Sequence, residues 1–169
     1  MRALVYQSFT PTPNGLACDD VSVEAIVEHV GTPVYIYSAR AIREAYRAID
    51  DAFAAYPHAI HYALKANSTL AIVRLLRSIG SKVDANSGGE IHVAQRVGFL
   101  PAEVIFTGVG KTRGELEYAI ANGIASINAE SAGERDRIAA VAHTLGVEAR
   151  VALREEDLRR VRAPLRALF

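Results

Sequence analysis

The sequence is poor in cysteine and lysine and has no long hydrophobic run. Cys18 is the single cysteine among 169 residues, which excludes an internal disulfide framework and a zinc site built from cysteines alone. No apolar run approaches the roughly 20 residues of a membrane span, and the first ten residues lack the long apolar core of a signal peptide. We therefore expect a protein of the cytoplasm.

The chain also has no excess of charge of either sign. Nineteen basic residues balance nineteen acidic ones, so no global attraction draws the chain to nucleic acid or to an anionic membrane, and we expect neither as a partner. Half of the residues are hydrophobic and 22% are charged, which is typical of a globular protein. Only Lys65, Lys82 and Lys111 are lysines, so each of them stands out against the arginines.

The N-terminal third gives a mixed pattern. Pro, Asn and Gly cluster within residues 1–20, which predicts irregular structure there. Serines at possible cap positions predict a helix over 22–29 and another over 39–55. Between them, the β-branched and aromatic run at 34–38 predicts a strand.

From residue 58 onward, predicted strands and helices alternate. The strands are expected at 59–67, 82–87, 103–108, 124–130 and 148–154, with helices at 69–79, 89–97, 113–122 and 132–145. Repeated β–α units imply a parallel sheet with right-handed crossovers, hence an α/β fold. No GxGxxG follows a strand, which disfavours a dinucleotide-binding fold. A complete eight-stranded barrel takes about 250 residues, more than this chain has.

Polar residues gather where the predicted strands end, and the carboxyl ends of parallel strands carry the active site in β/α barrels. These residues are Lys65, Asn67, Asp84, Asn86, Ser87, Thr107, Asn128, Glu130 and Arg154. Most strands end in polar loops for structural reasons alone. Lys65 differs because it follows an apolar stretch and precedes a helix. We expect its amine to be partly desolvated, which lowers its pKa and favours Schiff-base formation with an aldehyde.

A second lysine lies in GVGKT at 108–112. The segment has part of the phosphate-loop pattern GxxxxGK[ST], but Ile105 stands where that pattern requires glycine. This departure disfavours a nucleotide-binding loop, and the segment is interpreted as a loop at the carboxyl end of the strand over 103–108.

Five segments occur in an order that resembles a known family. They are GTPVYIYSA at 31–39, HYALKAN at 61–67, SKVDANSGGEI at 81–91, FTGVGKT at 106–112 and INAES at 127–131. Together they resemble the N-terminal part of the diaminopimelate decarboxylase family over about residues 20–154. The resemblance implies part of a (β/α)8 TIM-like barrel of the alanine-racemase type, with about five of the eight strands.

The resemblance also implies roles for individual residues. Lys65 matches the catalytic lysine that holds pyridoxal 5'-phosphate covalently, and Asp84 and Glu90 match acidic residues near that end of the cofactor. Ser87 lies in the matching turn. Arg154 falls where related decarboxylases place an arginine near the phenolic oxygen of the cofactor.

His61 and Asn67 flank the lysine as supporting residues, and a packed strand position is the alternative for His61. His92 is expected to face solvent or to pack. No metal site is expected.

The family resemblance further implies decarboxylation of meso-diaminopimelate to L-lysine, an amino-acid substrate and a homodimer. Residues 1–36 correspond to a segment that contributes to the β domain in this family, and residues 37–154 to the partial cofactor-binding barrel. The family pattern then stops. The arginine-rich tail at 155–169 matches no family motif, and either a shifted reading frame or a divergent helix accounts for it.

We expect such a shortened chain to be inactive alone, and either to be unstable or to oligomerise through the open edges of its parallel sheet. The alternatives are another pyridoxal-phosphate decarboxylase or racemase on the same barrel, and a non-catalytic α/β scaffold.

Overall fold

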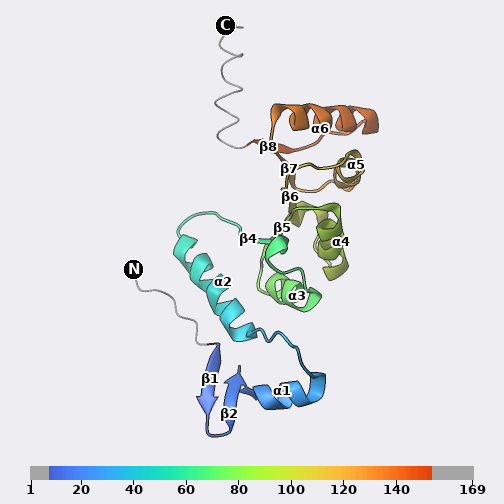
Figure 1. Cartoon of the computed structure of the whole chain (residues 1–169). Helices are drawn as coiled ribbons and strands as arrows, with labels where there is room; N and C mark the ends of the chain where they lie inside the picture. The colour runs from blue at the N-terminus through green and yellow to red at the C-terminus, as the bar shows by residue number, and fades with distance from the viewer. Residues whose placement is uncertain (1–7, 154–169) are drawn as a thin grey trace. The chain divides into compact units, whose positions relative to one another are not determined.

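A computed structural model describes residues 8–153 of the chain. The chain divides into two compact units, one ending at His58 and the other beginning at Ala59 (Figure 1).

The N-terminal unit begins with a small antiparallel sheet. Its strands are β1 (Phe9–Thr12), β2 (Gly15–Cys18) and β3 (Val21–Ser22). The prediction of irregular structure over residues 1–20 is therefore wrong for this hairpin. Pro13 and Asn14 form a two-residue turn between the paired residues Thr12 and Gly15, and Gly15 adopts a φ of 112° that other residues rarely adopt.

Two helices complete this unit and confirm the predictions from capping serines. They are α1 (Val23–Val30) and α2 (Ala39–Phe53). The Ser22 hydroxyl accepts a hydrogen bond from the Ala25 N–H, and the Ser38 hydroxyl accepts one from the Ala41 N–H. Each serine thus satisfies an amide that has no partner within its own helix.

The strand predicted at 34–38 is not formed. The segment is irregular, and Tyr35 is 87% exposed. Among the described residues, no strand pairs with it. High β-propensity does not produce a strand where the backbone lacks a neighbour to hydrogen-bond with.

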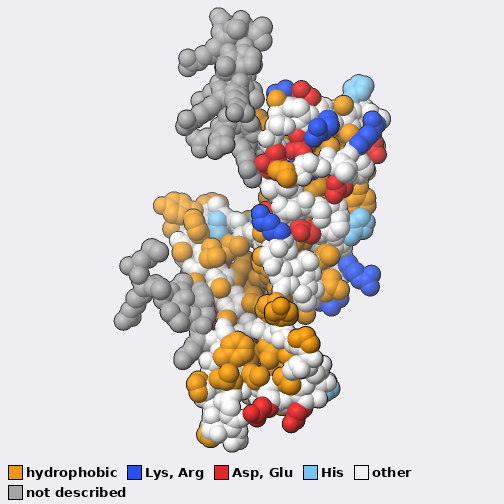
Figure 2. All heavy atoms as spheres, viewed as in Figure 1, with side chains coloured by type: hydrophobic (Ala, Val, Ile, Leu, Met, Phe, Trp, Pro, Cys, Tyr) orange, Lys and Arg blue, Asp and Glu red, His pale blue; other side chains and the backbone are white. Residues whose placement is uncertain are grey.

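The surface of the N-terminal unit retains many hydrophobic side chains. Figure 2 shows them gathered around the β1–β2 hairpin and α1 on the viewed face. The exposed residues include Phe9, Leu16, Val21 and Val30. Grouped apolar side chains of this kind are typical of surfaces that pack against other protein.

The C-terminal unit contains a parallel sheet with strands in sequential order. The strands are β4 (His61–Ala63), β5 (Lys82–Ala85), β6 (Val104–Phe106), β7 (Ser126–Ala129) and β8 (Val151–Leu153). The helices are α3 (Leu70–Ser78), α4 (Gly88–Val97), α5 (Arg113–Ala121) and α6 (Ala132–Leu145), with a 3-10 turn η2 (Pro101–Glu103) before β6. This alternation confirms the predicted β–α units, and Figure 1 shows all four helices on one side of the strands.

Burial alternates along each central strand. Val83, Phe106 and Ile127 point to the helices and are almost completely buried in one core with residues of α4, α5 and α6. Their neighbours in the strands point to the opposite face, which no described helix of this unit covers, and are only half-buried. We call this second face the open face of the sheet.

The first strand is shorter than predicted. Residues 59–67 were expected to be one strand, but β4 ends at Ala63 and the 3-10 turn η1 (Leu64–Ala66) follows. This turn buries Leu64 in the core, with 1% of its surface exposed. Lys65 therefore lies on a turn at the carboxyl end of β4.

Two isoleucines on neighbouring strands test this one-sided packing. We expect Ile127→Ala to lower the free energy of unfolding by about 2–5 kcal/mol, because it leaves a cavity in the helix-covered core. Ile105→Ala removes the same atoms from the half-buried open face and should cost about 1 kcal/mol. Urea unfolding followed by circular dichroism measures both losses. Equal losses would contradict the assignment of the two faces.

Candidate active site at the carboxyl ends of the strands

The open face carries polar side chains at the carboxyl ends of β5, β6 and β7. Asp84 is paired in register with Ala63 of β4 on one side and with Ile105 of β6 on the other. Beyond Ile105, the Thr107 hydroxyl accepts a hydrogen bond of 3.0 Å from the side-chain amide of Asn128. The structure thus brings together polar residues that the sequence places at separate strand ends.

Lys65 lies beside these polar side chains, but it is exposed to solvent. It follows the register partner of Asp84 by two residues, and it is exposed. The expectation of a partly buried lysine is therefore wrong in this structure. The physical reason is that β4 is an edge strand of the described sheet, and η1 turns the lysine away from the core.

Asp84 and Asn86 have unused hydrogen-bonding capacity. The Asp84 Oδ1 and Asn86 Nδ2 atoms are buried, and neither has a hydrogen-bond partner among residues 8–153. Burying such atoms without partners is costly, so they mark a place where an additional polar group fits. A carboxylate acceptor and an amide donor lie near the same strand end.

Ser87 and Glu90 are engaged with the backbone at the start of α4. The Ser87 hydroxyl accepts a hydrogen bond from the Glu90 N–H at 3.2 Å, and Glu90 Oε2 accepts one from the Asn86 N–H at 2.7 Å. This reciprocal arrangement stabilises a helix N-terminus. In this structure the two residues hold the loop that carries Asn86.

The same arrangement occurs a second time at the start of α6. The Ser131 hydroxyl accepts from the Glu134 N–H at 3.2 Å, and Glu134 Oε2 accepts from the Glu130 N–H at 2.9 Å. The sequence contains the corresponding repeat, ANSGGE at 85–90 and AESAGE at 129–134. That repeat is the signal in the sequence that marks Glu134, like Glu90, as a helix residue that holds the preceding loop, and it was not used in the prediction.

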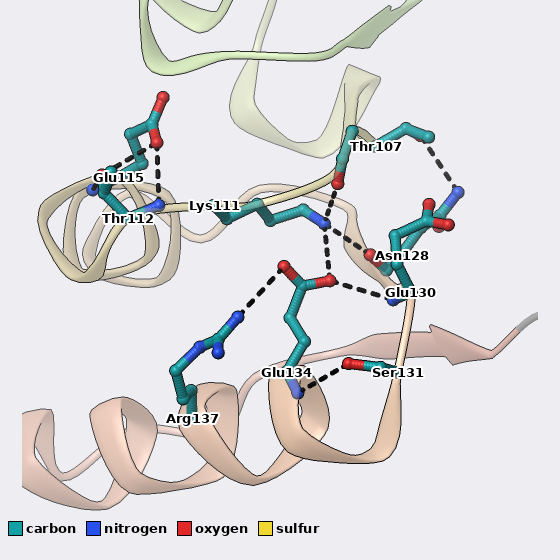
Figure 3. Close-up of polar contacts among 10 residues, drawn as sticks. Thr107, Lys111, Thr112, Glu115, Asn128, Glu130, Ser131, Glu134 and Arg137 are labelled. Atoms are coloured by element: carbon teal, nitrogen blue, oxygen red, sulfur yellow. Dashed lines mark hydrogen bonds and ion pairs between the residues drawn. The ribbon is translucent and has the colours of Figure 1, made fainter.

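Lys111 was predicted only as part of a loop, and the structure gives it a buried partner. Its ammonium lies 3.1 Å from Glu134 Oε2, and the two side chains are only 1% and 3% exposed. Figure 3 shows the lysine extending from the β6–α5 loop to meet the carboxylate at the start of α6. The Arg137 guanidinium lies 3.7 Å from the other oxygen of Glu134.

Glu115 connects the start of α4 to the start of its own helix, α5. Its carboxylate accepts hydrogen bonds from the Gly88 N–H at 2.8 Å and from the Thr112 N–H at 2.9 Å. The bond from Gly88, then those from Thr112, hold the pKa of Glu115 below its ordinary value despite partial burial. The ionised carboxylate therefore ties the β5–α4 loop to the first turn of α5.

The remaining predicted site residues have local partners. His61 is half-buried with Nδ1 3.2 Å from the Val83 carbonyl, and the Asn67 side chain accepts from the Thr69 N–H before α3. His92 is exposed and stacks on Tyr118, as expected for a residue that faces solvent or packs. Arg154 lies outside the described residues.

A model of a known family matches most of the chain. The model, "Pyridoxal-dependent decarboxylase, pyridoxal binding domain", matches residues 39–161. The chain belongs to this family. The membership confirms the resemblance stated from the motifs and makes the polar row at the strand ends the candidate cofactor site of a pyridoxal-dependent decarboxylase.

Similar proteins include several diaminopimelate decarboxylases. Diaminopimelate decarboxylase of Pseudomonas aeruginosa is 42% identical over 139 residues, which cover 82% of this chain and 34% of the relative. The chain thus spans about a third of the length of the relatives that it matches.

Solved structures agree in fold. Diaminopimelate decarboxylase of M. jannaschii in complex with L-lysine superposes with a TM-score of 0.82 at 30% identity, over 86% of this chain and 35% of that one. The Helicobacter pylori enzyme with L-lysine gives 0.75 at 37% identity, over 78% of this chain and 34% of that one. The partial barrel predicted from the sequence is therefore confirmed.

The residues of the site fit a pyridoxal group. Such a cofactor presents an aldehyde for a lysine amine and polar ring atoms for charged and amide side chains. Lys65 offers an exposed amine, and the unpartnered atoms of Asp84 and Asn86 lie at the adjacent strand end. Within residues 8–153, no cluster of His, Cys, Asp or Glu could hold a metal ion, and no helix is long and apolar enough to cross a membrane.

The role of Glu115 makes stability depend on pH. We expect Glu115→Gln to lower the free energy of unfolding by about 1 kcal/mol at pH 7, because the charged acceptor of two backbone amides is lost. A lowered pKa means that the carboxylate stabilises the fold above its ordinary value of 4.5. The difference between variant and wild type should vanish as the pH falls below 4.5, through the lowered pKa.

Urea unfolding between about pH 3 and pH 7 gives this comparison. Glu117→Gln is the matched control, since that carboxylate pairs with the exposed Arg113 side chain and should contribute only about 0.3 kcal/mol. An effect of Glu115→Gln that is independent of pH would show that the charge is not what holds the loop.

Proposed function

We propose that the protein containing this chain is a pyridoxal-phosphate-dependent decarboxylase that converts meso-diaminopimelate to L-lysine in lysine biosynthesis. The observation that carries the proposal is the placement of Lys65 beside the buried, unpartnered atoms of Asp84 and Asn86. Family membership and the identity to diaminopimelate decarboxylases support the reaction class and the substrate. The lysine bound in two similar enzymes is the product expected for this reaction.

Lys65 is the proposed catalytic residue. Lys65 is exposed and lies on η1, at the carboxyl end of β4. The cofactor supplies an electron-withdrawing ring that takes up the electron pair left when a carboxylate departs as carbon dioxide. The chain then has to hold the lysine, orient the ring and place charges around it.

Asp84, Ser87 and Glu90 are the proposed cofactor-binding residues within the described part. The unpartnered Asp84 oxygen is the group most directly available to a ligand. Ser87 and Glu90 act by holding the loop that carries Asn86, since their own hydrogen bonds go to backbone amides. Arg154, outside the described residues, stays a prediction for the phenolic oxygen of the cofactor.

The proposal extends to assembly and location. We propose that the full-length protein is a homodimer of the cytoplasm, and that residues 1–36 contribute to its β domain. The exposed apolar side chains on β1, β2 and α1 support such packing.

Covalent attachment of the cofactor tests the role of Lys65. The chain is incubated with pyridoxal phosphate below one equivalent, reduced with borohydride and digested for mass spectrometry. We expect the label at Lys65, its loss in Lys65→Ala, and its retention in the control Lys82→Ala. Equal labelling of Lys82 and Lys65 would contradict the proposal.

A substitution at Asp84 tests whether Lys65 belongs to a binding site or is an exposed amine that reacts without one. We expect Asp84→Asn to raise the pyridoxal-phosphate concentration for half-maximal labelling of Lys65 roughly tenfold, because a charged partner is lost. The absorbance of the bound cofactor, titrated in both proteins, gives the two concentrations. Identical concentrations would mean that Lys65 reacts without a site around it.

The reaction is tested in a chimera. Residues 20–153 of this chain replace the matching segment of the Pseudomonas aeruginosa enzyme, and carbon dioxide release is measured from meso-diaminopimelate, L-lysine and L-ornithine. We expect release from meso-diaminopimelate only, abolished by Lys65→Ala. Preference for another diamino acid would favour a different decarboxylase, and the 169-residue chain assayed alone tests the expectation that it is inactive.

A further inference from the structure

The ammonium of Lys111 is buried and has a full set of acceptors. It donates to the Gly108 carbonyl at 2.6 Å, to the Asn128 carbonyl at 2.7 Å and to Glu134 Oε2 at 3.1 Å. An ammonium has three N–H groups, so each one has a partner. The lysine stem also places the charge 5.4 Å from the centre of the buried Phe106 ring.

These acceptors lie where two neighbouring strands separate. The last paired residues of β6 and β7 are Phe106 and Ile127. The lysine binds the carbonyl of Asn128, which directly follows Ile127, and that of Gly108, two residues after Phe106. The ammonium therefore joins two backbone segments just past the end of the strand pairing.

Both joined carbonyls are next to the polar pair of the open face. Asn128 supplies its own carbonyl to Lys111 and its side-chain amide to Thr107, which directly precedes Gly108. Gly108 has a φ of 106°, and a side chain there would lie only 2.6 Å from the Asn86 carbonyl oxygen. A small shift of this backbone would thus move Thr107 and Asn128 and disturb the neighbouring loop at Asn86.

Stability alone is a weak reason for such an arrangement. Replacing a buried ion pair by apolar groups is often neutral or stabilising, because desolvating two charges offsets their attraction. An ammonium differs from an apolar side chain in fixing three acceptors at set distances. The use of Lys111 is therefore better explained by the geometry that it imposes.

We propose that Lys111, with Glu134, is a positioning residue of the cofactor site. It sets the spacing of β6 and β7 beyond their last pair and so orients the Thr107–Asn128 side-chain pair on the open face. The polar atoms of a bound pyridoxal ring are the chemistry that these two side chains are placed to meet. This part of the inference rests on the proposed function.

The test uses Lys111→Met together with the double variant Lys111→Met/Glu134→Gln. The single variant leaves a buried carboxylate without its cation, so it is expected to lose stability. The double variant removes both charges, and the amide introduced by Glu134→Gln keeps a carbonyl oxygen that can accept from the Glu130 N–H. Arg113→Met is the control, because it removes a cation two residues away that is 70% exposed.

Three readouts separate positioning from stability. Thermal unfolding reports the fold, the NMR signals of the Asn128 side-chain amide report its bond to Thr107, and titration with pyridoxal phosphate reports the site. For the double variant we expect near wild-type unfolding, a shifted Asn128 amide signal, and roughly tenfold weaker cofactor binding. Arg113→Met should match the wild type in all three.

The remaining outcomes either overturn the inference or leave the Asn128 amide signal as its test. A double variant that folds, keeps the Asn128 amide signal and binds the cofactor as tightly as wild type overturns the inference. If the wild type shows no attachment at Lys65, the proposed function fails, and the Asn128 amide signal alone then decides whether Lys111 positions the pair. A double variant that cannot fold shows that Lys111 is needed for stability and contradicts a positioning role.

Discussion

The C-terminal unit depends on the burial of one face of its parallel sheet against helices on a single side. Strand residues alternate between the two faces, so the residues that fill the core determine which residues face the other way. Val83, Phe106 and Ile127 are almost fully buried against the helices. Asp84 and Asn128 are consequently turned to the open face, and a shift of one residue in register would exchange the two sets.

Local interactions at the carboxyl end hold the loops that follow the strands. At α4 and again at α6, a serine caps the helix while the glutamate three residues later binds a backbone N–H of the preceding loop. Glu115 and Lys111 then connect neighbouring loops, the first through Gly88 and the second through Asn128. Hydrogen bonds between a charged side chain and a backbone group are among the stronger hydrogen bonds in proteins. Such bonds can keep the loops around a site in a fixed position.

The residues suggested by family resemblance fall into two groups in the structure. Ser87 and Glu90 already use their side chains to order the β5–α4 loop. Lys65 is exposed, and one oxygen of Asp84 is buried without a hydrogen-bond partner in the described part of the chain. The second group is the one with capacity for a ligand, which is why the proposed chemistry begins at Lys65 and Asp84.

The sequence by itself determined the order of strands and helices from β4 to β8, the family and the lysine at the first strand end. Periodicity, capping serines and ordered motifs are local signals, and they survive folding because each acts within a few residues. The same local reasoning was wrong at 34–38, where no strand pairs with an apolar, β-branched segment among the residues that the structure describes. It was also wrong for the burial of Lys65, because β4 is an edge strand and η1 turns the residue outward.

Only the tertiary structure decided which residues, far apart in the sequence, form the buried ion pair. Lys111 and Glu134 are 23 positions apart, and they meet because β6 and β7 are neighbours in a parallel sheet whose loops emerge at the same edge.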